Sequence, residues 1–366
     1  MKTNKTRAFI SSTTQLKKAI ISISALLNSF GQGDLYFGVE KDGKVVGIEA
    51  TKKTLNYISK SISKNITPKF DYQISFLSIN SRKCIHISLF GKHSPYYAYG
   101  KVYKRKENRN IQLFPNEINQ MIIPNGSYKK FWDSLPSDFP MQNIDEQHLN
   151  KFIEKAKKSG RLKSGDYLTV GGLKKLGVVQ NNRINNAGKL LFSSDNPLRV
   201  DMKIYSDDEQ DNLVEHKIIH GNLHYVMKRV IIFIKSNMEW KDKNYKDHKE
   251  KVPEIPIKAL CEALVNSFCH RDYKNDESNK IIITGDQIEI YNPGKFPDIL
   301  NPSTNREKNH TSFPRNPILA NLLYLSGDIK KWGSGLDTIQ RESEHADLDV
   351  EFKNGGQGFS TIFYRN

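Results

Sequence analysis

The sequence predicts an α+β protein that is divided into several domains. Its 366 residues exceed the length that a single hydrophobic core usually serves. Segments with helical periodicity alternate with short strand-like segments, and glycine turns separate them. Because 37% of the residues are hydrophobic, there are enough apolar side chains for packed cores, and we do not expect a disordered chain.

Positive charge is concentrated in the first third of the chain. Residues 1–130 hold 22 Lys and Arg against 7 Asp and Glu, whereas the other 236 residues carry only about +1 of the total charge of +16. A uniformly lysine-rich composition would spread the excess evenly. The asymmetry predicts an N-terminal region that meets polyanions. Nucleic acid, DNA or RNA, is our first expectation and an anionic membrane surface the second.

The cysteines and the apolar segments indicate a cytoplasmic protein without a membrane span. Cys84, Cys261 and Cys269 form no CxxC pattern, which argues against a disulfide scaffold or a zinc ribbon and fits a reducing compartment. The apolar run 16–27 has a basic flank, but it is too short to cross a bilayer and no small-x-small cleavage site follows. We interpret it as a buried amphipathic helix.

In the N-terminal third, the pattern predicts two helices and several strands. A helix over 14–30 ends at the glycines of GQG, which readily take the positive φ of a helix C-terminus. The sequence KDGK predicts a hairpin turn at Asp42–Gly43. The other predicted elements are strands at 34–40, 45–49, 72–79 and 83–90 and a helix at 55–66.

The rest of the chain divides into a linker, a connector and a C-terminal region. We predict a domain at 1–123, a turn-rich linker at 124–142, a connector at 143–250 and a C-terminal domain at 251–366. Within the connector the predicted helices are 145–159, 170–176 and 222–238, and a strand-rich passage starts at RINNAGKLLF. In the C-terminal domain the predicted elements are helices at 257–269 and 318–327, a further helix after WGSG, strands at 280–286 and 287–292, and a final strand pair within 349–365.

The segment CEALVNSFCHRDY places Glu262 and Asn266 four residues apart on one face of a predicted helix. An Asn oxygen can ligate Mg²⁺ that also holds phosphate oxygens, and a nearby Glu can orient or deprotonate a water. Alone, such a pair is more often a polar stripe on a core helix. Downstream, the phrase KKWGSGLD offers backbone N–H groups and a helix N-terminus to a phosphate.

Four phrases together resemble the GHKL (Bergerat-fold) ATP-binding family: EALVNSFCHRDY, IEIYNPG, RNPILANLLYLSG and KKWGSGLDTI. The resemblance covers residues 250–366 and implies an α/β sandwich that binds Mg-ATP. It implies that Glu262 is the candidate catalytic water activator and that Asn266 holds the metal. It further implies adenine and phosphate contacts by Asn292, Gly294, Gly333, Gly335 and Thr361.

The adenine motif departs from the family pattern in two places. Asn292 replaces the usual Asp, and Phe296 replaces the next glycine. Because Asn can still accept a hydrogen bond from an adenine amino group, we expect binding to survive better than turnover. The loop 293–317 is predicted to act as a lid over the nucleotide, and the alternative is an ordinary solvated loop. We expect that any of four basic residues in this loop could approach phosphate: Arg306, Lys308, His310 and Arg315.

Residues 1–123 resemble the Schlafen AlbA-like domain through ISALLNSFGQGDLYFGVEKDGKVVGIE and SPYYAYGKVYKRKENRNIQLFPNEI. The resemblance implies nucleic-acid binding, and the aromatic and basic residues of the second phrase agree, since cations engage phosphates and rings stack on bases. A solvated strand edge with its tyrosines in the core is the alternative. The candidate contacts are Tyr97, Tyr99, Lys101, Tyr103, Lys104, Arg105, Lys106 and Arg109.

Nuclease members of that family carry two Glu in an ExxxxEFK-like phrase and an acid after GV. The corresponding segment KTNKTRAFISS has no carboxylate, and only Glu40 and Asp42 follow Gly38–Val39. So few acids rarely hold the divalent ions needed for phosphodiester hydrolysis. We therefore expect binding without cleavage.

The connector carries a weaker resemblance to the same ATP-binding proteins over 143–240. We expect capping rather than catalysis from Asn185, Asn186 and Lys189. We expect no metal site from the histidines 216, 220 and 224, because a strand-to-helix junction separates them.

These patterns predict an ATP-responsive nucleic-acid-binding regulator, in transcription control or phage defence, that uses ATP and Mg and self-associates into a homo-oligomer. One alternative is an enzyme, either a slow ATPase or a Schlafen-like nuclease. The other is a binding scaffold with a decayed nucleotide site.

Overall fold

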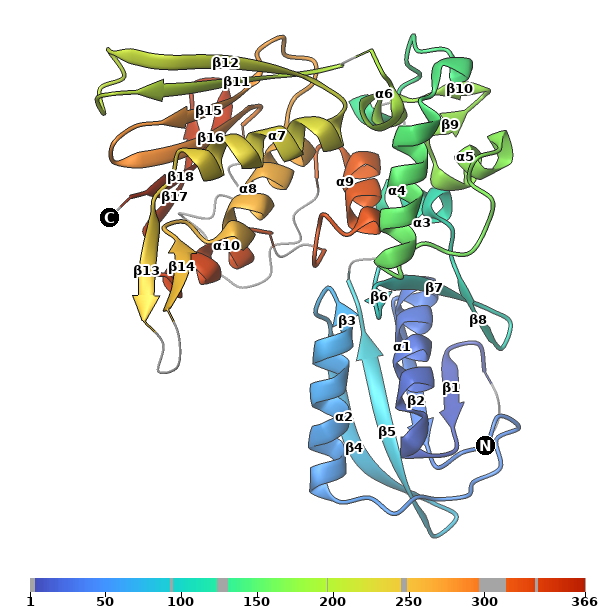
Figure 1. Cartoon of the computed structure of the whole chain (residues 1–366). Coiled ribbons are helices and arrows are strands. Elements are labelled where there is room, and N and C mark those ends of the chain that lie inside the picture. Colours follow the sequence, from blue (N-terminus) through green and yellow to red (C-terminus); the bar gives the residue numbers. More distant parts are fainter. Residues whose placement is uncertain are drawn as a thin grey trace. The chain divides into compact units, whose positions relative to one another are not determined.

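The protein is described by a computed structural model that covers residues 4–92, 95–123, 131–195, 197–244, 249–295, 314–332 and 335–365. The chain forms two compact units (Figure 1). Unit 1 comprises Met1–Pro124 with Gly160–Gly165, and unit 2 comprises Asn125–Ser159 with Asp166–Asn366. The predicted α+β, multidomain class is confirmed.

Unit 1 is built on a four-stranded sheet in the order β1-β2-β5-β4, in which only β1 and β2 are parallel. Helices α1 and α2 pack against it and bury a core of aliphatic side chains (Figure 1). Along β2, Leu35 and Phe37 enter this core, whereas Tyr36 joins a smaller cluster with Phe9 and Cys84. The strands and helices are β1 (Arg7–Ile10), α1 (Leu16–Phe30), β2 (Gln32–Phe37), α2 (Lys52–Asn65), β4 (Asp71–Ile79) and β5 (Arg82–Phe90).

A second small sheet in unit 1 has the order β3-β6-β7-β8 and packs beside α1. The buried Asn28 on α1 fixes it, because Nδ2 donates to the carbonyls of Tyr96 at 2.8 Å and Tyr103 at 2.9 Å, and Oδ1 accepts from the Tyr96 amide at 2.7 Å. The elements are β3 (Ile66–Thr67), β6 (Tyr97–Ala98), β7 (Lys101–Lys106), β8 (Arg109–Gln112) and α3 (Pro115–Ile122).

Unit 2 is built on a six-stranded mixed sheet in the order β12-β11-β15-β16-β18-β17. Helices α7, α8 and α10 lie over one face (Figure 1), which gives the layered α/β arrangement that the C-terminal motifs predicted. The strands are β11 (Leu198–Tyr205), β12 (Leu213–Gly221), β15 (Asn279–Ile283), β16 (Gln287–Pro293), β17 (Val350–Gly355) and β18 (Gly358–Tyr364). The covering helices are α7 (Leu223–Ser236), α8 (Ile257–His270) and α10 (Gly335–Glu344).

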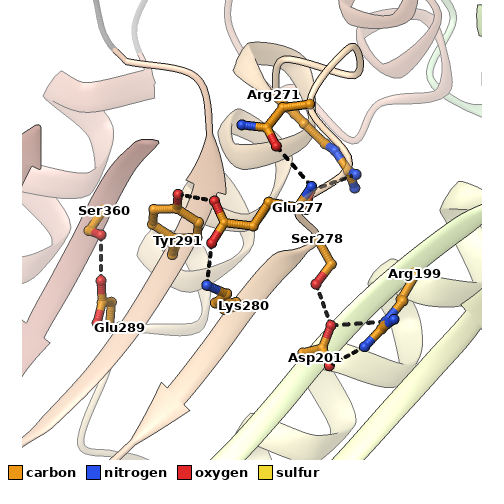
Figure 2. Close-up of polar contacts among 10 residues, drawn as sticks. Arg199, Asp201, Arg271, Glu277, Ser278, Lys280, Glu289, Tyr291 and Ser360 are labelled. Atoms are coloured by element: carbon orange, nitrogen blue, oxygen red, sulfur yellow. Dashed lines mark hydrogen bonds and ion pairs between the residues drawn. The ribbon is translucent and has the colours of Figure 1, made fainter. Parts of the chain in front are cut away.

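The opposite face of this sheet carries polar pairs. Glu277 accepts from the Tyr291 hydroxyl at 2.7 Å and also bonds Lys280, and Ser360 bonds Glu289 across β16 and β18 (Figure 2). Alternation along the strands therefore places Tyr291 outward and its neighbour Asn292 inward, under the helices. One face of the sheet is therefore covered by helices and holds Asn292, and the other face carries the polar pairs.

The remaining elements of unit 2 are a helical group and a hairpin. Their bounds are η3 (Trp132–Ser134), η4 (Met141–Asn143), α4 (Glu146–Lys158), α5 (Val170–Leu176), β9 (Val179–Gln180), β10 (Arg183–Ile184), α6 (Asn186–Phe192), β13 (Trp240–Asn244), β14 (Lys249–Pro253) and α9 (Pro317–Ser326).

Several local predictions differ from the structure. The predicted hairpin at 34–49 is reduced to a single bridge between Val39 and Val45. NAGKLLF forms α6 rather than opening a strand, because Asn185 caps the helix by accepting from the Gly188 amide. Strand β1 and the β13–β14 hairpin were not predicted.

The predicted end of the N-terminal domain at 123 lies next to the end of the main segment of unit 1 at Pro124, but the predicted linker is not separate from unit 2 and the border at 250 does not divide two bodies. Asp133, in the predicted linker, is fully buried in unit 2. Strands β11 and β12 come from the predicted connector, yet β11 pairs in parallel with β15 of the C-terminal region. Connector and C-terminal region therefore share one sheet, which local sequence patterns do not reveal because the pairing joins segments about 80 residues apart.

Candidate functional sites

Helix α8 presents Glu262 and Asn266 on one face, as their spacing predicted. The apolar residues Leu260, Leu264 and Val265 anchor the helix in the core. Glu262 is only 6% exposed, and this burial raises the pKa of its carboxyl to about 7, although the charge of Lys330 opposes the shift. A carboxyl that titrates near neutral pH suits proton transfer to or from a water.

The start of α10 lies directly against this pair. A Cβ added to Gly335 would stand 2.4 Å from Nδ2 of Asn266 and 3.0 Å from Oε1 of Glu262, so a larger residue here would push the ends of these two side chains aside. The structure therefore brings together three of the predicted site residues. Gly333 lies outside the described residues.

The end of β16 supplies the predicted adenine motif. Asn292 is 2% exposed, and its Nδ2 donates to the Pro293 carbonyl at 3.1 Å. The amide nitrogen of Asn292 is used in this bond, so the amide oxygen, Oδ1, is the atom that can accept a hydrogen bond from a ligand. Gly294 has φ +99°, and a Cβ there would meet the backbone nitrogen of Asp272 at 3.0 Å, so the turn requires glycine. Phe296 lies outside the described residues.

Thr361 lies on β18, next to this motif. In the register of the two strands, Ile290 pairs with Thr361 and Asn292 pairs with Phe359, so Thr361 and Asn292 lie diagonally on the same inner face of the sheet. Thr361 is 4% exposed. The fold thus gathers Asn292, Gly294 and Thr361 at adjacent strands.

Residues 270–273 (HRDY), for which the sequence predicted no role, follow α8 and make contacts that hold its C-terminal end in place. Arg271 is buried, donates to Asn279 Oδ1 at 3.0 Å and lies 5.0 Å from the Tyr273 ring centroid. Asn316 donates to the carbonyls of Cys269 at 3.1 Å and Arg271 at 2.8 Å. The phrase therefore positions the helix that carries Glu262 and Asn266.

Of the four lid residues that the sequence singled out, Arg315 is the one that falls within the described residues. Its Nε donates to the His270 carbonyl at 3.1 Å, and its guanidinium also bonds the Lys295 carbonyl at 2.9 Å. Burial lowers the pKa of His270 to about 4, and the charge of Arg315 adds to the shift, so this imidazole is neutral at pH 7. Arg306, Lys308 and His310 lie outside the described residues.

Asp133 is a buried acid that the sequence reading missed. Its Oδ2 accepts from the backbone amides of Ile318 at 2.7 Å and Leu319 at 3.0 Å, at the N-terminus of α9. Complete burial raises its pKa to about 7, although these two bonds act in the opposite direction. The residue stands about 185 positions from its partners, so no local pattern could have identified it.

His216 and His224 of the connector contact different acidic residues and do not lie together in one cluster. His216 on β12 contacts Asp201 at 3.1 Å, whereas His224 on α7 contacts Asp328 at 3.0 Å. Asp201 also accepts from Arg199 and Ser278 (Figure 2). No cluster of metal ligands occurs among the residues that the structure describes. Asn185 caps α6 as expected.

In unit 1 the candidate nucleic-acid residues divide by burial. Tyr97 is 1% exposed, so its ring is not a free stacking surface, and this part of the prediction does not fit the structure. Tyr103 packs against the core beside α1. Tyr99 is 38% exposed in the β6–β7 turn, with Lys17 Nζ 6.0 Å from its ring centroid.

The basic residues of β7 and β8 alternate in direction. Lys104, Lys106 and Arg109 are exposed and Lys101 is half-buried. The Arg105 side chain turns inward and donates to Asn110 and to the Arg7 carbonyl. Side chains on a strand point alternately to its two sides. The basic run of β7 therefore places Lys104 and Lys106 in solvent and Arg105 on the opposite, inner side.

Two family models match the chain. Residues 4–114 match the model described as "Schlafen, AlbA_2", and residues 276–363 match HATPase_c_4, described as "Putative ATP-dependent DNA helicase recG C-terminal". The chain therefore combines an AlbA-like N-terminal domain with an ATPase-type C-terminal domain, as the motifs predicted. The second match covers Asn292, Gly294, Gly335 and Thr361, and it begins after Glu262 and Asn266.

The whole chain can be aligned with a solved structure. It is the DIP2311 protein from Corynebacterium diphtheriae, with a TM-score of 0.66 and 16% identity over 100% of this chain and 77% of that one. At this identity the likeness shows the fold alone. No curated protein matches the chain.

Within the described parts of the chain, no helix is both long and apolar enough to cross a bilayer.

Proposed function

We propose that the protein is an ATP-responsive nucleic-acid-binding regulator. In this proposal unit 2 binds Mg-ATP, and unit 1 contacts DNA or RNA. The observation that carries the nucleotide half is the close approach of Gly335 on α10 to Glu262 and Asn266 on α8. Of these two helices, α10 lies within the region that the ATPase-type model matches.

The side chains present suit a magnesium-bound nucleotide. The Asn266 carboxamide oxygen is a hard ligand of the kind Mg²⁺ prefers, and the N-terminus of α10 offers backbone N–H groups to phosphate. Asn292 supplies an acceptor on the inner face of the sheet, near Thr361. When bound, Mg²⁺ would neutralise phosphate charge, Asn266 would hold the ion, and Glu262 would orient water.

A slow ATPase is the second candidate, and the buried Glu262 favours it. Its pKa of about 7 means that the carboxyl can accept a proton at neutral pH. A binding scaffold with a decayed nucleotide site remains the opposite alternative, and a binding measurement separates the two.

The nucleic-acid half rests on the AlbA-like match and on the charge of the N-terminal third. Exposed Lys104, Lys106 and Arg109 would engage phosphates, and the exposed ring of Tyr99 would stack on a base. Cleavage is not part of the proposal. We further propose a cytoplasmic, oligomeric protein acting in transcription control or phage defence.

Calorimetric titration of Mg-ATP into the full chain tests the nucleotide half. We expect saturable binding that Asn266→Ala weakens at least about tenfold, whereas Gln340→Ala, which removes an exposed carboxamide from α10, leaves it unchanged. If wild type shows no heat of binding and no ATP-dependent thermal shift, the nucleotide half fails. For unit 1, binding of single-stranded RNA and DNA must fall steeply with added salt.

A further inference from the structure

A small pocket in unit 1 is lined by four cations from four separate segments. Arg7 lies on β1, Lys18 on α1, Lys41 in the turn that follows β2, and Arg105 on β7. The pocket has a volume of ≈ 80 Å³, several times the space that one water requires. Its other lining residues are uncharged, namely Ala8, Phe9, Ser22, Asn108 and Asn110.

The pocket is held together by Arg105. Its two terminal nitrogens donate to Asn110 Oδ1 at 3.1 Å and to the Arg7 carbonyl at 2.8 Å. Asn110 in turn donates to Ser22 on α1 at 2.9 Å. The remaining guanidinium nitrogen, Nε, is buried and has no hydrogen-bond partner within the described structure. Arg105 and Asn110 therefore join β1, β7 and β8 to α1 around the pocket.

The charges of the pocket repel one another. Burial lowers the pKa of the Lys18 ammonium, and the charge of Lys41 lowers it further. Burial also lowers the pKa of Arg105. No carboxylate belongs to the described lining, and none of the four cations forms an ion pair with a described acidic residue. Lys18 and Lys41 are exposed at the mouth of the pocket, whereas Arg7 and Arg105 are half-buried, and an anion held among the four cations would offset their mutual repulsion.

We propose that this pocket binds one phosphate group of a nucleic-acid strand. The inference rests on the proposed function of unit 1 and adds the place and the chemistry of one contact. A phosphate group presents two or three charged oxygens, which matches cations arriving from several directions. Because no lining residue is a carboxylate that could hold a divalent ion, the pocket retains the phosphate without hydrolysing it.

The test compares two double variants of the full chain that lose the same charge. Lys18→Gln with Lys41→Gln removes two pocket cations and spares the structural Arg105. Lys44→Gln with Lys60→Gln removes two exposed cations of unit 1 that lie outside the pocket. The probe is a fluorescent single-stranded 12-mer, with a 5′-phosphate or a 5′-hydroxyl, and anisotropy is measured from about 50 to 200 mM salt. Circular dichroism verifies that each variant is folded.

We expect the pocket variant to bind about tenfold more weakly, with the slope of log K against log salt reduced by about 0.7 per lost phosphate contact. The control variant should lose less than about threefold. If the 5′-phosphate strengthens wild-type binding and the pocket variant loses that gain, the ligand is a terminal phosphate. Equal losses on both oligonucleotides identify an internal phosphate.

Two results separate this proposal from the proposed function. If both double variants weaken binding equally, the pocket inference is overturned, while nucleic-acid binding by unit 1 stands. If wild type binds no oligonucleotide, the proposed function of unit 1 fails. A thermal-shift titration with inorganic phosphate then tests whether the pocket binds phosphate. A phosphate-dependent thermal shift that disappears in the pocket variant supports a phosphate site, and the lack of any shift in wild type overturns it.

Discussion

The backbone of Gly335 lies so close to Asn266 that a Cβ at position 335 would stand 2.4 Å from the Asn266 amide nitrogen. Two helices, α8 and α10, therefore meet at a point where a side chain on α10 would displace the Asn266 carboxamide. This contact joins the residue expected to hold the metal to the residue expected to approach phosphate.

Gly335→Ala should disturb this meeting point. We expect overpacking to cost about 1–3 kcal/mol of the free energy of unfolding and to weaken Mg-ATP binding at least about tenfold. Gly355→Ala is the matched control, because a Cβ there meets nothing within 4 Å. Chemical denaturation and calorimetry measure the two effects. Unchanged ATP affinity in Gly335→Ala would show that the contact has no part in the site.

Glu262→Gln should separate binding from turnover. The carboxyl must be ionised to accept a proton, so any ATP hydrolysis should rise with pH through about 7, the pKa to which burial raises it. The variant should keep Mg-ATP affinity and lose about 10²-fold or more in rate. Hydrolysis that persists in Glu262→Gln, with the same pH profile, would remove this residue from the mechanism.

Asp133 should make stability depend on pH. Its pKa is raised from 3.8 to about 7, so between these values the folded state binds the proton more strongly than the unfolded state does. Stability therefore falls as pH rises from about 4 to about 7, by up to about 1.4 kcal/mol per unit. Asp133→Asn keeps an acceptor for the α9 amides without the charge.

Relative to wild type, Asp133→Asn should gain stability as pH rises through that window, as urea denaturation at several pH values would measure. Asp138→Asn is the control, because Lys189 lowers the pKa of the exposed Asp138 carboxyl. Relative to wild type, this variant should therefore lose stability, not gain it, as pH rises. A stability difference between Asp133→Asn and wild type that stays constant from pH 4 to pH 8 would contradict the account.

The sequence predicted well what depends on local pattern. Helix α1 ends at Gly31, which has φ +69° as the GQG phrase required, and Glu262 and Asn266 share a face because helical spacing places them there. The sequence could not predict the joining of β11 to β15 or the capping of α9 by Asp133, and it left open whether Tyr97 is exposed or, as the structure shows, buried. Each depends on a partner distant along the chain, where local periodicity carries no information.

The burial of Tyr97 leads to a prediction for unit 1. Tyr97→Phe keeps the buried ring and should leave nucleic-acid affinity within about twofold. Tyr99→Ala removes an exposed ring and should cost about 1–3 kcal/mol of binding free energy if one base stacks there. Anisotropy titrations with the same oligonucleotide measure both. Equal losses in the two variants would mean that Tyr99 has no special stacking role.

The central claim is that Asn266 and its neighbours form a Mg-ATP site, and a thermal-shift titration of the full chain tests it most directly. The account predicts that the melting temperature of wild type rises with Mg-ATP concentration, by an amount set by RT ln(1 + [ATP]/Kd). It also predicts that folded Asn266→Ala shows a clearly smaller rise at the same concentrations. A wild-type melting temperature that does not change with Mg-ATP, or an equal rise in Asn266→Ala, would contradict it.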